Sequence, residues 1–245
     1  MNPVLELRNV AKRFGGLRAV KSVSFEMNAG EILFVIGPNG AGKTTVFNLI
    51  TGFLHPDEGQ IIFQGKNISR LAPHRTAHLG IGRTFQMVKP LRNLSVLQNV
   101  MLGAFMHTAN LHRAQQEAEK ILEFLQMGHL KDSLAQGLPL AAMKRLEIAR
   151  ALATKPKLML LDEVVSGLTP GEALALAGLV KRLPEWGVSV VGGVEHVMQV
   201  VMRIADRIVV LDYGARIAEG KPADVVKLPV VIEAYLGAKY KELQK

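Results

Sequence analysis

The sequence predicts an α/β fold: a mainly parallel sheet with helices, an antiparallel β region at the start of the chain, and an inserted helical segment. Three observations lead to this prediction. Residues 4–10 alternate apolar and polar side chains and a Gly-Gly turn leads to a second apolar segment, and later apolar runs alternate with segments of helical periodicity. From about residue 95 to 152 the chain is instead rich in Leu, Ala, Glu, Gln and Lys.

The chain begins with two predicted strands. Residues 4–10 alternate in the manner of a half-buried strand, and a turn at Gly15-Gly16 leads to a second apolar segment over 19–27. We expect these segments to pair as an antiparallel sheet. Phe14 precedes the turn, where it can either stack on a flat adenine ring or anchor the end of the strand. The residues alone favour the anchor.

A phosphate-binding loop is predicted directly after the apolar run 32–36. The stretch that follows fits the pattern G-x-x-x-x-G-K-[ST], between a strand and a helix over about 43–51. Glycines let successive N–H groups face one centre, and the helix adds its positive N-terminal end. A plain Gly-rich turn is the alternative. The residues of the predicted loop are Gly37, Pro38, Asn39, Gly40, Ala41, Gly42, Lys43, Thr44 and Thr45.

Two side chains of this loop have separate predicted roles. Lys43 is expected to reach the β- and γ-phosphates of a bound nucleoside triphosphate, and the Thr44 hydroxyl is expected to ligate Mg²⁺. Further along, a short strand is predicted over 59–65, before the helical insert. Three more strands, over 157–163, 187–191 and 207–211, complete a parallel sheet with helices between them.

Two acids end the strand over 157–163. Ligands of an open parallel sheet bind beyond the carboxyl ends of its strands, so Asp162 and Glu163 are expected at the same edge as the phosphate loop. Asp162 can hold the magnesium shell, and Glu163 can position the water that attacks the γ-phosphate. Simple termination of the strand is the alternative.

Several other polar residues are less distinctive. His196 follows a predicted strand and is expected at the same edge, where it can donate a hydrogen bond to the γ-phosphate or act as a surface residue. Gln86 is only a polar loop residue by itself. His74 and His78 have helical i, i+4 spacing without a third ligand nearby, which predicts surface residues rather than a metal site.

Composition limits the classes of function. The 245 residues include 30 Lys and Arg against 21 Asp and Glu, for a net charge of +9, yet no block of consecutive basic residues with interleaved aromatics supports nucleic-acid binding. The absence of Cys excludes disulfides and thiolate metal sites. With no secretory signal and no apolar run near about 18 residues, we expect a cytoplasmic protein that reaches a membrane only through a partner.

In this order, these residues resemble the ATP-binding subunit of an ABC transporter over almost the whole chain. The resemblance implies a single cassette with a P-loop NTPase architecture. Its RecA-like ATP-binding core would span residues 1–87 and 156–245, and its inserted helical signature subdomain would span residues 88–155. Residues 82–86, 148–152 and 231–237 resemble the branched-chain amino-acid importer cassettes most closely.

The resemblance also implies roles for single residues. Phe14 matches the aromatic that stacks on adenine, Gln86 the glutamine that touches Mg²⁺ and senses the transmembrane partner, and His196 the switch histidine. Asp162 and Glu163 match the magnesium aspartate and the catalytic glutamate.

The stretches that meet a second cassette depart from the family pattern. Residues 166–169 match the loop that crosses the dimer interface, with Thr169 where an Asp is common. The signature Leu-Ser-Gly-Gly-Gln, which closes on the ATP of the opposite subunit, aligns with Leu-Pro-Leu-Ala-Ala at residues 138–142. A helix N-terminus just ahead of residues 144–152 remains, with Pro tolerated at its first position. We expect a weakened half-site and favour a heterodimer with a cassette whose signature is intact.

The function implied is ATP binding and hydrolysis that energises import of branched-chain or related amino acids. The implied cofactors are ATP and Mg²⁺, and the partners are a second ATP-binding subunit, transmembrane permease subunits and, indirectly, a substrate-binding protein, with no nucleic acid. The subunit would lie on the inner face of the cell membrane. The alternatives are a cassette for another substrate, such as amide or urea transport or lipopolysaccharide-type export, and a soluble non-transport ABC ATPase. The helical insert and the Asp-Glu pair disfavour a P-loop kinase or a small GTPase.

Overall fold

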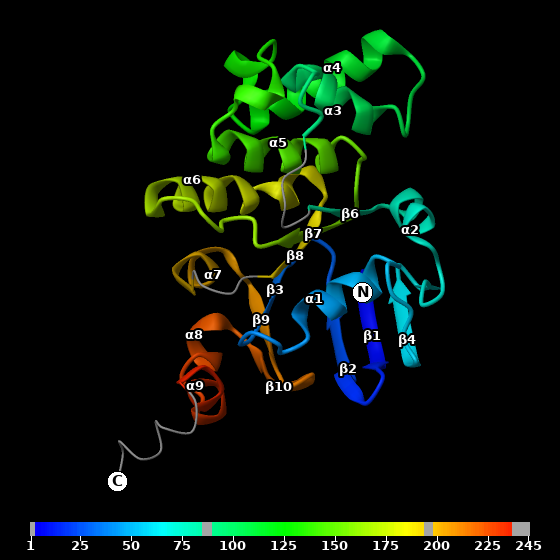
Figure 1. The fold of residues 1–245 in the computed structure, drawn as a ribbon, viewed down its shortest axis with the longest axis vertical. Coiled ribbons are helices and arrows are strands. Elements are labelled where there is room, and N and C mark those ends of the chain that lie inside the picture. The colour runs from blue at the N-terminus through cyan, green and yellow to red at the C-terminus, as the bar shows by residue number, and fades with distance from the viewer. Residues whose placement is uncertain (1–2, 85–89, 194–197, 237–245) are drawn as a thin grey trace.

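A computed structural model describes residues 3–84, 90–193 and 198–236 of the chain. Two sheets form its lower half, and a group of helices, α3 to α5, lies above them (Figure 1). One sheet has six strands in the order β10-β9-β3-β8-β7-β6, and the other has four in the order β2-β1-β4-β5. The α/β prediction with a mainly parallel sheet, an N-terminal antiparallel region and a helical insert is confirmed.

The six-stranded sheet is parallel except at one edge. β3 pairs in parallel with β8 and β9, β7 pairs in parallel with β6 and β8, and only β10 runs antiparallel, to β9. The carboxyl ends of β3, β8 and β7 therefore lie side by side at one edge. The strands are β3 Ile32–Ile36, β6 Ile81–Arg83, β7 Leu158–Asp162, β8 Ser189–Gly193, β9 Arg207–Asp212 and β10 Ala215–Gly220.

Both faces of this sheet are buried, which explains the continuous apolar runs of its central strands. Successive side chains of a strand point to opposite faces. Along β3, Phe34 and Ile36 belong to the hydrophobic cluster shared with the helices α3 to α7, and Leu33 and Val35 belong to the cluster shared with the antiparallel sheet. The sheet thus separates two hydrophobic cores.

The antiparallel sheet begins with a long hairpin. β1 pairs with β2 up to Phe14 and Leu17, so the predicted turn lies at Gly15-Gly16 and Phe14 is the last residue of its strand. β1 also pairs with β4. The strands are β1 Leu5–Phe14, β2 Leu17–Met27, β4 Glu58–Phe63 and β5 Lys66–Asn67.

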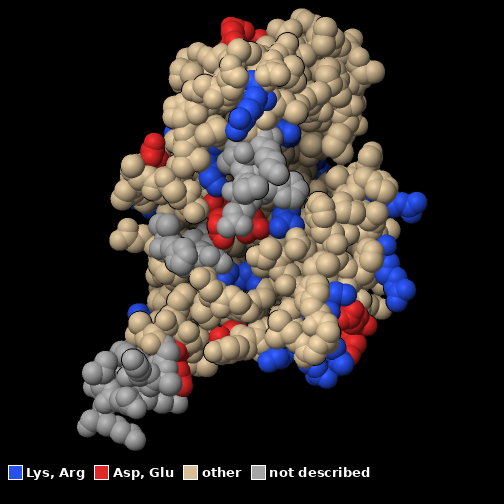
Figure 2. All heavy atoms as spheres, in the orientation of Figure 1, with Lys and Arg blue, Asp and Glu red and all other residues tan. Residues whose placement is uncertain are grey.

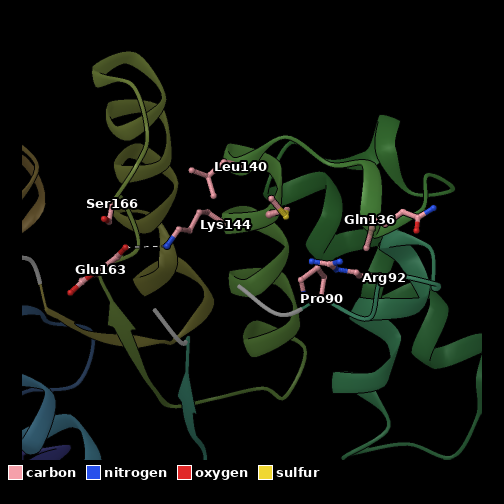
Figure 3. Close-up of a pocket in the computed structure, with 9 residues that line it drawn as sticks. Pro90, Arg92, Gln136, Leu140, Lys144, Glu163 and Ser166 are labelled. Atoms are coloured by element: carbon pink, nitrogen blue, oxygen red, sulfur yellow. Dashed lines mark hydrogen bonds between the residues drawn. The ribbon is translucent and has the colours of Figure 1, made fainter. Parts of the chain in front are cut away.

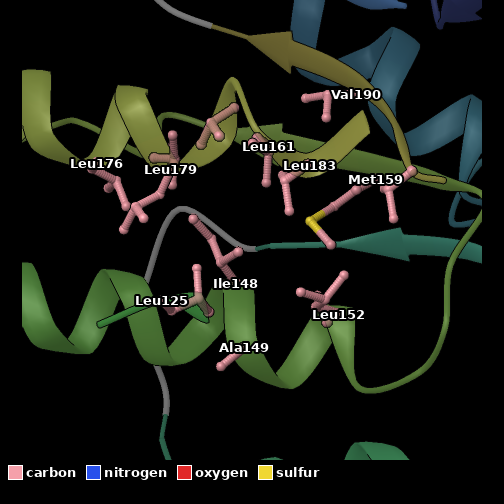
Figure 4. Close-up of a cluster of buried hydrophobic side chains, with 14 of the residues drawn as sticks. Leu125, Ile148, Ala149, Leu152, Met159, Leu161, Leu176, Leu179, Leu183 and Val190 are labelled. Carbon is pink, nitrogen blue, oxygen red and sulfur yellow. The ribbon is translucent and has the colours of Figure 1, made fainter. Parts of the chain in front are cut away.

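The helical lobe packs directly on the parallel sheet. Ile148 and Leu152 of α5 face Met159 and Leu161 of β7 in one buried cluster (Figure 4). The lobe and the sheet therefore share a core, and the subdomain boundaries at 88 and 155 stay a prediction. The lobe helices are α3 Val96–Ala104, α4 Leu111–Phe124 and α5 Leu140–Leu152, with the short turns η1 Gly128–Leu130 and η2 Ala135–Gly137.

The remaining helices flank the sheets. None of the helices within the described residues is both long enough and apolar enough to cross a membrane. The helices are α1 Lys43–Ile50, α2 Pro73–Leu79, α6 Pro170–Val180, η3 Leu183–Trp186, α7 Met198–Ile204, α8 Pro222–Val225 and α9 Pro229–Leu236.

Lys and Arg side chains are dispersed over the face shown in Figure 2, with Asp and Glu among them, as expected of a solvated surface.

Several predicted boundaries were wrong: the strand predicted over 4–10 extends to Phe14, and the strand predicted over 59–65 ends at Phe63. Two others have a clear structural cause. The strand expected over 187–191 is shifted two residues along, because Gly187 takes a left-handed conformation (φ +72°) that ends η3 and so precedes the strand. The helix expected from residue 144 begins at Leu140, and Pro139 is its N-cap rather than its first residue. Most of the altered signature stretch is therefore the first turn of α5.

Candidate functional site

The phosphate loop lies between β3 and α1, at the carboxyl edge of the parallel sheet (Figure 1). Gly37 and Gly42 have φ values of +152° and +102°. A Cβ atom at Gly37 would lie 2.1 Å from the carbonyl oxygen of Leu211, and one at Gly42 would lie 2.5 Å from that of Ala19. The backbones of β9 and β2 thus leave no room for a side chain at these two positions, and only glycine fits at either.

Lys43 lies inside this loop. Its side chain is buried, and its Nζ donates hydrogen bonds to the carbonyl oxygens of Gly37 at 2.7 Å and Pro38 at 2.9 Å. The ammonium group is therefore held at the concave centre of the loop, where phosphate oxygens are the natural acceptors to replace these carbonyls. Thr44, the next residue, is exposed at the helix N-terminus.

A cavity of about 640 Å³ extends from the loop toward the β1–β2 hairpin. Phe14 and Tyr213 contribute aromatic rings to its lining, and the segment 40–45 contributes the start of α1. Phe14 is 46% exposed, so its ring is accessible from this cavity. The cavity joins an aromatic ring to a phosphate loop, as a nucleotide site requires.

Phe14 is held in place from one side. Lys12 Nζ lies 5.9 Å from the centroid of the Phe14 ring and 2.7 Å from Asp57 Oδ1. The pKa of Asp57 is lowered, first by the hydrogen bond from Lys12 and then by the one from the backbone N–H of Arg13. This ion pair fixes the end of β1 against the turn that precedes β4.

Asp162 ends β7 and is paired with a cation that sequence analysis did not single out. The Arg83 guanidinium donates to Asp162 Oδ2 at 3.0 Å and to Asn48 Oδ1 of α1 at 2.6 Å. Its Cζ lies 5.9 Å from the ring centroids of both Phe47 and Phe53. Arg83 therefore ties the acid at the strand end to the helix that follows the phosphate loop.

Glu163 follows Asp162 with a left-handed backbone, at φ +47°. This conformation costs about 1–3 kcal/mol for a residue with a side chain and is found mostly where surrounding contacts impose it. Its N–H donates to the carbonyl oxygen of Gly193 at 3.0 Å, and its carbonyl accepts from Lys144 Nζ at 3.2 Å. Glu163 and Lys144 line a second cavity, of about 480 Å³ (Figure 3).

The altered signature stretch contributes Leu140 to the lining of this second cavity. The N–H of Met143 donates to the carbonyl oxygen of Pro139 at 2.9 Å, so the N–H groups of residues 140–142 lie at the open end of the helix. No side chain caps this end. Leu140 points toward the loop that carries Ser166, and its Cδ2 would lie 3.1 Å from a Cβ atom at Gly167 (Figure 3).

Thr169 has a structural role in its own chain. Its hydroxyl and the carboxylate of Glu172 form a capping box at the start of α6. The hydroxyl donates to Glu172 Oε2 at 2.7 Å, and this bond, with one from the Thr169 N–H, lowers the pKa of Glu172. The Thr that stands where an Asp is common therefore preserves the helix cap.

The structure brings Phe14 and residues 40–45 of the loop to one cavity. Asp162 and Glu163 lie at the end of β7, at the carboxyl edge of the sheet where the loop follows β3, and Glu163 lines the second cavity. Two further predicted site residues, Gln86 and His196, lie outside the described residues. His74 and His78 are exposed, and the described residues contain no group of three His, Asp or Glu side chains able to hold a metal ion. The prediction that His74 and His78 are surface residues is confirmed.

Sequence reasoning missed Arg83, Lys144 and Tyr213. Arg83 stands three residues before Gln86, and Lys144 stands two residues after the signature stretch 138–142. Their closeness to these motifs in the sequence was the only signal for them. Tyr213 had no sequence signal, because its position beside the loop depends on the pairing of β9 with β10 and β3.

Comparison with known proteins places this geometry in a family. The sequence profile of the family described as "ABC transporter" matches residues 20–166, which include the phosphate loop, the signature stretch and the two acids. The chain belongs to the ABC transporter family. A second profile, described as "Branched-chain amino acid ATP-binding cassette transporter", matches residues 215–241 of this ABC cassette.

Relatives match over nearly their full length. The chain is 38% identical to the probable branched-chain amino acid transport ATP-binding protein LivG of Archaeoglobus fulgidus, with 98% of each chain covered. It is also 38% identical to the high-affinity branched-chain amino acid transport ATP-binding protein BraF of Pseudomonas aeruginosa, over 96% of this chain and 98% of that one.

Solved structures share the fold. The ADP conformation of an ATP-binding cassette of an ABC transporter has a TM-score of 0.88 and 35% identity, covering 97% of this chain and 100% of that chain. A dimeric post-hydrolysis state of a cassette bound to ADP and Pi has a TM-score of 0.79 and 26% identity, covering 89% and 98%. The predictions of an ABC-type transport ATPase and of its P-loop NTPase fold are confirmed.

Proposed function

We propose that this cassette energises import of branched-chain or related amino acids through partner membrane subunits. The observation that carries the proposal is the agreement between two parts of the chain. Full-length relatives are named as branched-chain amino acid transport ATP-binding proteins, and the separate C-terminal profile, over residues 215–241, carries the same substrate class. The C-terminal match lies outside residues 20–166, which the general ABC profile covers, so it adds a substrate class that the general profile does not carry.

The substrate class is tested by reconstitution. The chain is purified from membranes with its permease subunits, and ATP-dependent uptake into vesicles is measured for leucine, isoleucine and valine beside urea and short amides. We expect uptake of a branched-chain or related amino acid only. Uptake of urea or amides alone would overturn the proposed substrate, and a chain that associates with no membrane protein would overturn the transport role.

The proposed ATP position follows from the cavity beside the phosphate loop. Phe14 contacts the adenine, residues 37–45 surround the phosphates, and Lys43 moves its hydrogen bonds from loop carbonyls to phosphate oxygens. Support comes from the single cavity that joins Phe14 to the N-terminus of α1 and from the buried position of Lys43. Backbone N–H groups and one ammonium thus meet the triphosphate charge.

Oxygen-bearing side chains in the site fit Mg²⁺, which prefers a few carboxylate or hydroxyl ligands and otherwise keeps water and phosphate oxygens. Thr44 and Asp162 would hold it, with Gln86 as a third ligand, and when bound it neutralises charge on the phosphates. Arg83 already donates a hydrogen bond to Asp162 Oδ2, so the carboxylate is held in position before any ligand binds. The Glu163 carboxylate orients the attacking water, and His196 donates a hydrogen bond to the γ-phosphate.

A second cassette is part of the proposal. The altered stretch 138–142 retains a helix N-terminus but lacks the Ser hydroxyl, the glycines and the Gln amide of the family pattern. We therefore favour a heterodimer in which the partner supplies an intact signature. The assembled complex would lie on the inner face of the cell membrane, bound to permease subunits and, through them, to a substrate-binding protein.

A further inference from the structure

Tyr213 occupies an unusual position for an aromatic residue. It is the first residue of the two-residue turn between β9 and β10, in which Asp212 pairs with Ala215. Tyr213 and Gly214 both have left-handed backbones, at φ +42° and +81°. Turns of this kind favour Asn or Asp followed by Gly, because a larger side chain is strained at positive φ. The residue is therefore a poor choice for the turn itself.

Backbone contacts fix this turn beside the phosphate loop. The N–H of Gly214 donates to the carbonyl oxygen of Ala41 at 3.0 Å, and the carbonyl oxygen of Gly214 accepts from the N–H of Lys21 at 2.6 Å. A Cβ atom at Gly214 would lie 2.7 Å from the carbonyl oxygen of Ala19. The turn is thus held between the loop and β2, and the contacts with both fix the position of the Tyr213 backbone, from which its side chain extends.

The Tyr213 ring contributes little to the hydrophobic cores. It is 79% exposed, more than any other large apolar or aromatic side chain among the described residues. It nevertheless lines the cavity that contains Phe14 and the segment 40–45. A strained backbone and an exposed ring in one residue, at the wall of a ligand cavity, favour contact with a ligand over a role in stability.

We propose that Tyr213 contacts the nucleoside part of bound ATP, as a second aromatic residue beside Phe14. The proposal rests on the proposed position of ATP in this cavity. The triphosphate charge is met by Lys43 and the loop N–H groups, whereas a phenol ring offers a face for stacking on a base and a hydroxyl for hydrogen bonding to ribose. Tyr213 therefore adds affinity for a nucleoside triphosphate over an inorganic polyphosphate.

The test compares ATP with inorganic tripolyphosphate, which has the same phosphate chain without the nucleoside. Dissociation constants of both are measured by titration calorimetry on the full-length wild-type chain and on the variants Tyr213→Asn and Tyr213→Phe. Asn suits the backbone of the turn and removes the ring, and Phe keeps the ring and removes the hydroxyl. Phe105→Asn, which removes a 42% exposed ring outside the cavity, is the matched control.

We expect Tyr213→Asn to weaken ATP binding about tenfold, as loss of one base-stacking ring does. Tyr213→Phe should stay within about threefold of wild type, since only one neutral hydrogen bond is lost. Tripolyphosphate binding should be unchanged in both variants, which also shows that the loop remains folded. Phe105→Asn should change neither constant.

Two results would overturn the role of Tyr213: unchanged ATP affinity in Tyr213→Asn, or an equal loss for ATP and tripolyphosphate, which would assign the residue to the loop structure. Failure of the proposed nucleotide site looks different. In that case the wild-type chain would bind ATP no more tightly than Lys43→Ala does, whatever residue stands at 213.

Discussion

The N-termini of α1 and α5 are prepared very differently for an anion. The first turn of α1 is preceded by a glycine loop that neighbouring strands hold in shape, with the Lys43 ammonium at its centre. α5 begins instead after Pro139, without a side-chain cap, and its first residue, Leu140, is an exposed apolar side chain turned toward Gly167. Both helices offer N–H groups and a favourable dipole, but of the two only α1 follows a glycine loop with a buried lysine inside it.

A helix N-terminus is therefore not equivalent to a phosphate site, and the two halves of this cassette are unequal. The half that would hold its own ATP has the loop, the aromatic residues and the paired acids. In the half that would close on the ATP of a second cassette, the stretch 138–142 itself offers only backbone groups. We expect substitutions in the first half to abolish activity and substitutions in the second half to have smaller effects.

Glu163→Gln should have the largest effect. The amide keeps the size and the hydrogen bonds of the backbone but cannot attract a proton from water, so steady-state ATP hydrolysis should fall about 10²- to 10⁴-fold. ATP affinity should be nearly unchanged, because the phosphates are held by the loop. Phosphate release and equilibrium ATP binding, measured on the assembled complex, check both parts. Normal turnover in this variant would falsify the catalytic role of Glu163.

Lys43→Ala should lower ATP affinity about 100-fold, from the loss of charge-assisted hydrogen bonds to phosphate. Lys131→Ala is the matched control, since Lys131 pairs with Glu119 on the surface and its side chain is 45% exposed. Calorimetric titration of ATP into the full-length chain measures both variants. Equal ATP affinity of the two variants would contradict the role of Lys43 in binding phosphate, and without that role α1 would not differ from α5 as a phosphate site.

Arg83→Met should lower the free energy of unfolding by about 3 kcal/mol, because it leaves the Asp162 carboxylate without its cation in a nearly buried place. The two side chains are only 9% and 13% exposed. Arg8→Met removes an exposed cation from a pair with Glu6 and should cost less than about 1 kcal/mol. Urea unfolding at neutral pH compares them. Equal midpoints for the two variants would show that Arg83 does not support the strand end.

Local chemistry made much of this architecture predictable from the sequence. The loop 37–45 needs its glycines and its Lys wherever it occurs, and continuous apolar runs such as 32–36 require a sheet that is covered on both faces. The position of Asp162 and Glu163, at the end of β7, followed from the rule that ligands bind at the carboxyl ends of parallel strands.

Residues whose position depends on contacts between distant segments were not predictable in this way. Arg83 and Asp162 are 79 positions apart and meet only because β6 pairs with β7. Tyr213 reaches the phosphate loop through the pairing of β9 with β3. A helix N-terminus at this stretch is predictable, but its first residue is not, because the sequence pattern does not fix a helix boundary to within a few residues: α5 begins at Leu140, and Pro139 is its N-cap.

Restoration of the signature stretch tests the central claim, that this cassette holds its own ATP with a complete loop and contributes a weakened signature to its partner. The substitutions Pro139→Ser, Leu140→Gly, Ala141→Gly and Ala142→Gln are combined in the complex of the chain with its second cassette and permease subunits, and steady-state ATP hydrolysis is measured. We expect the rate to rise at least about threefold, because the Ser hydroxyl and the freed backbone N–H groups add donors toward the facing ATP. ATP affinity of the isolated chain should stay the same, since its own phosphates are held by residues 37–45. An unchanged rate in the assembled complex would contradict the claim.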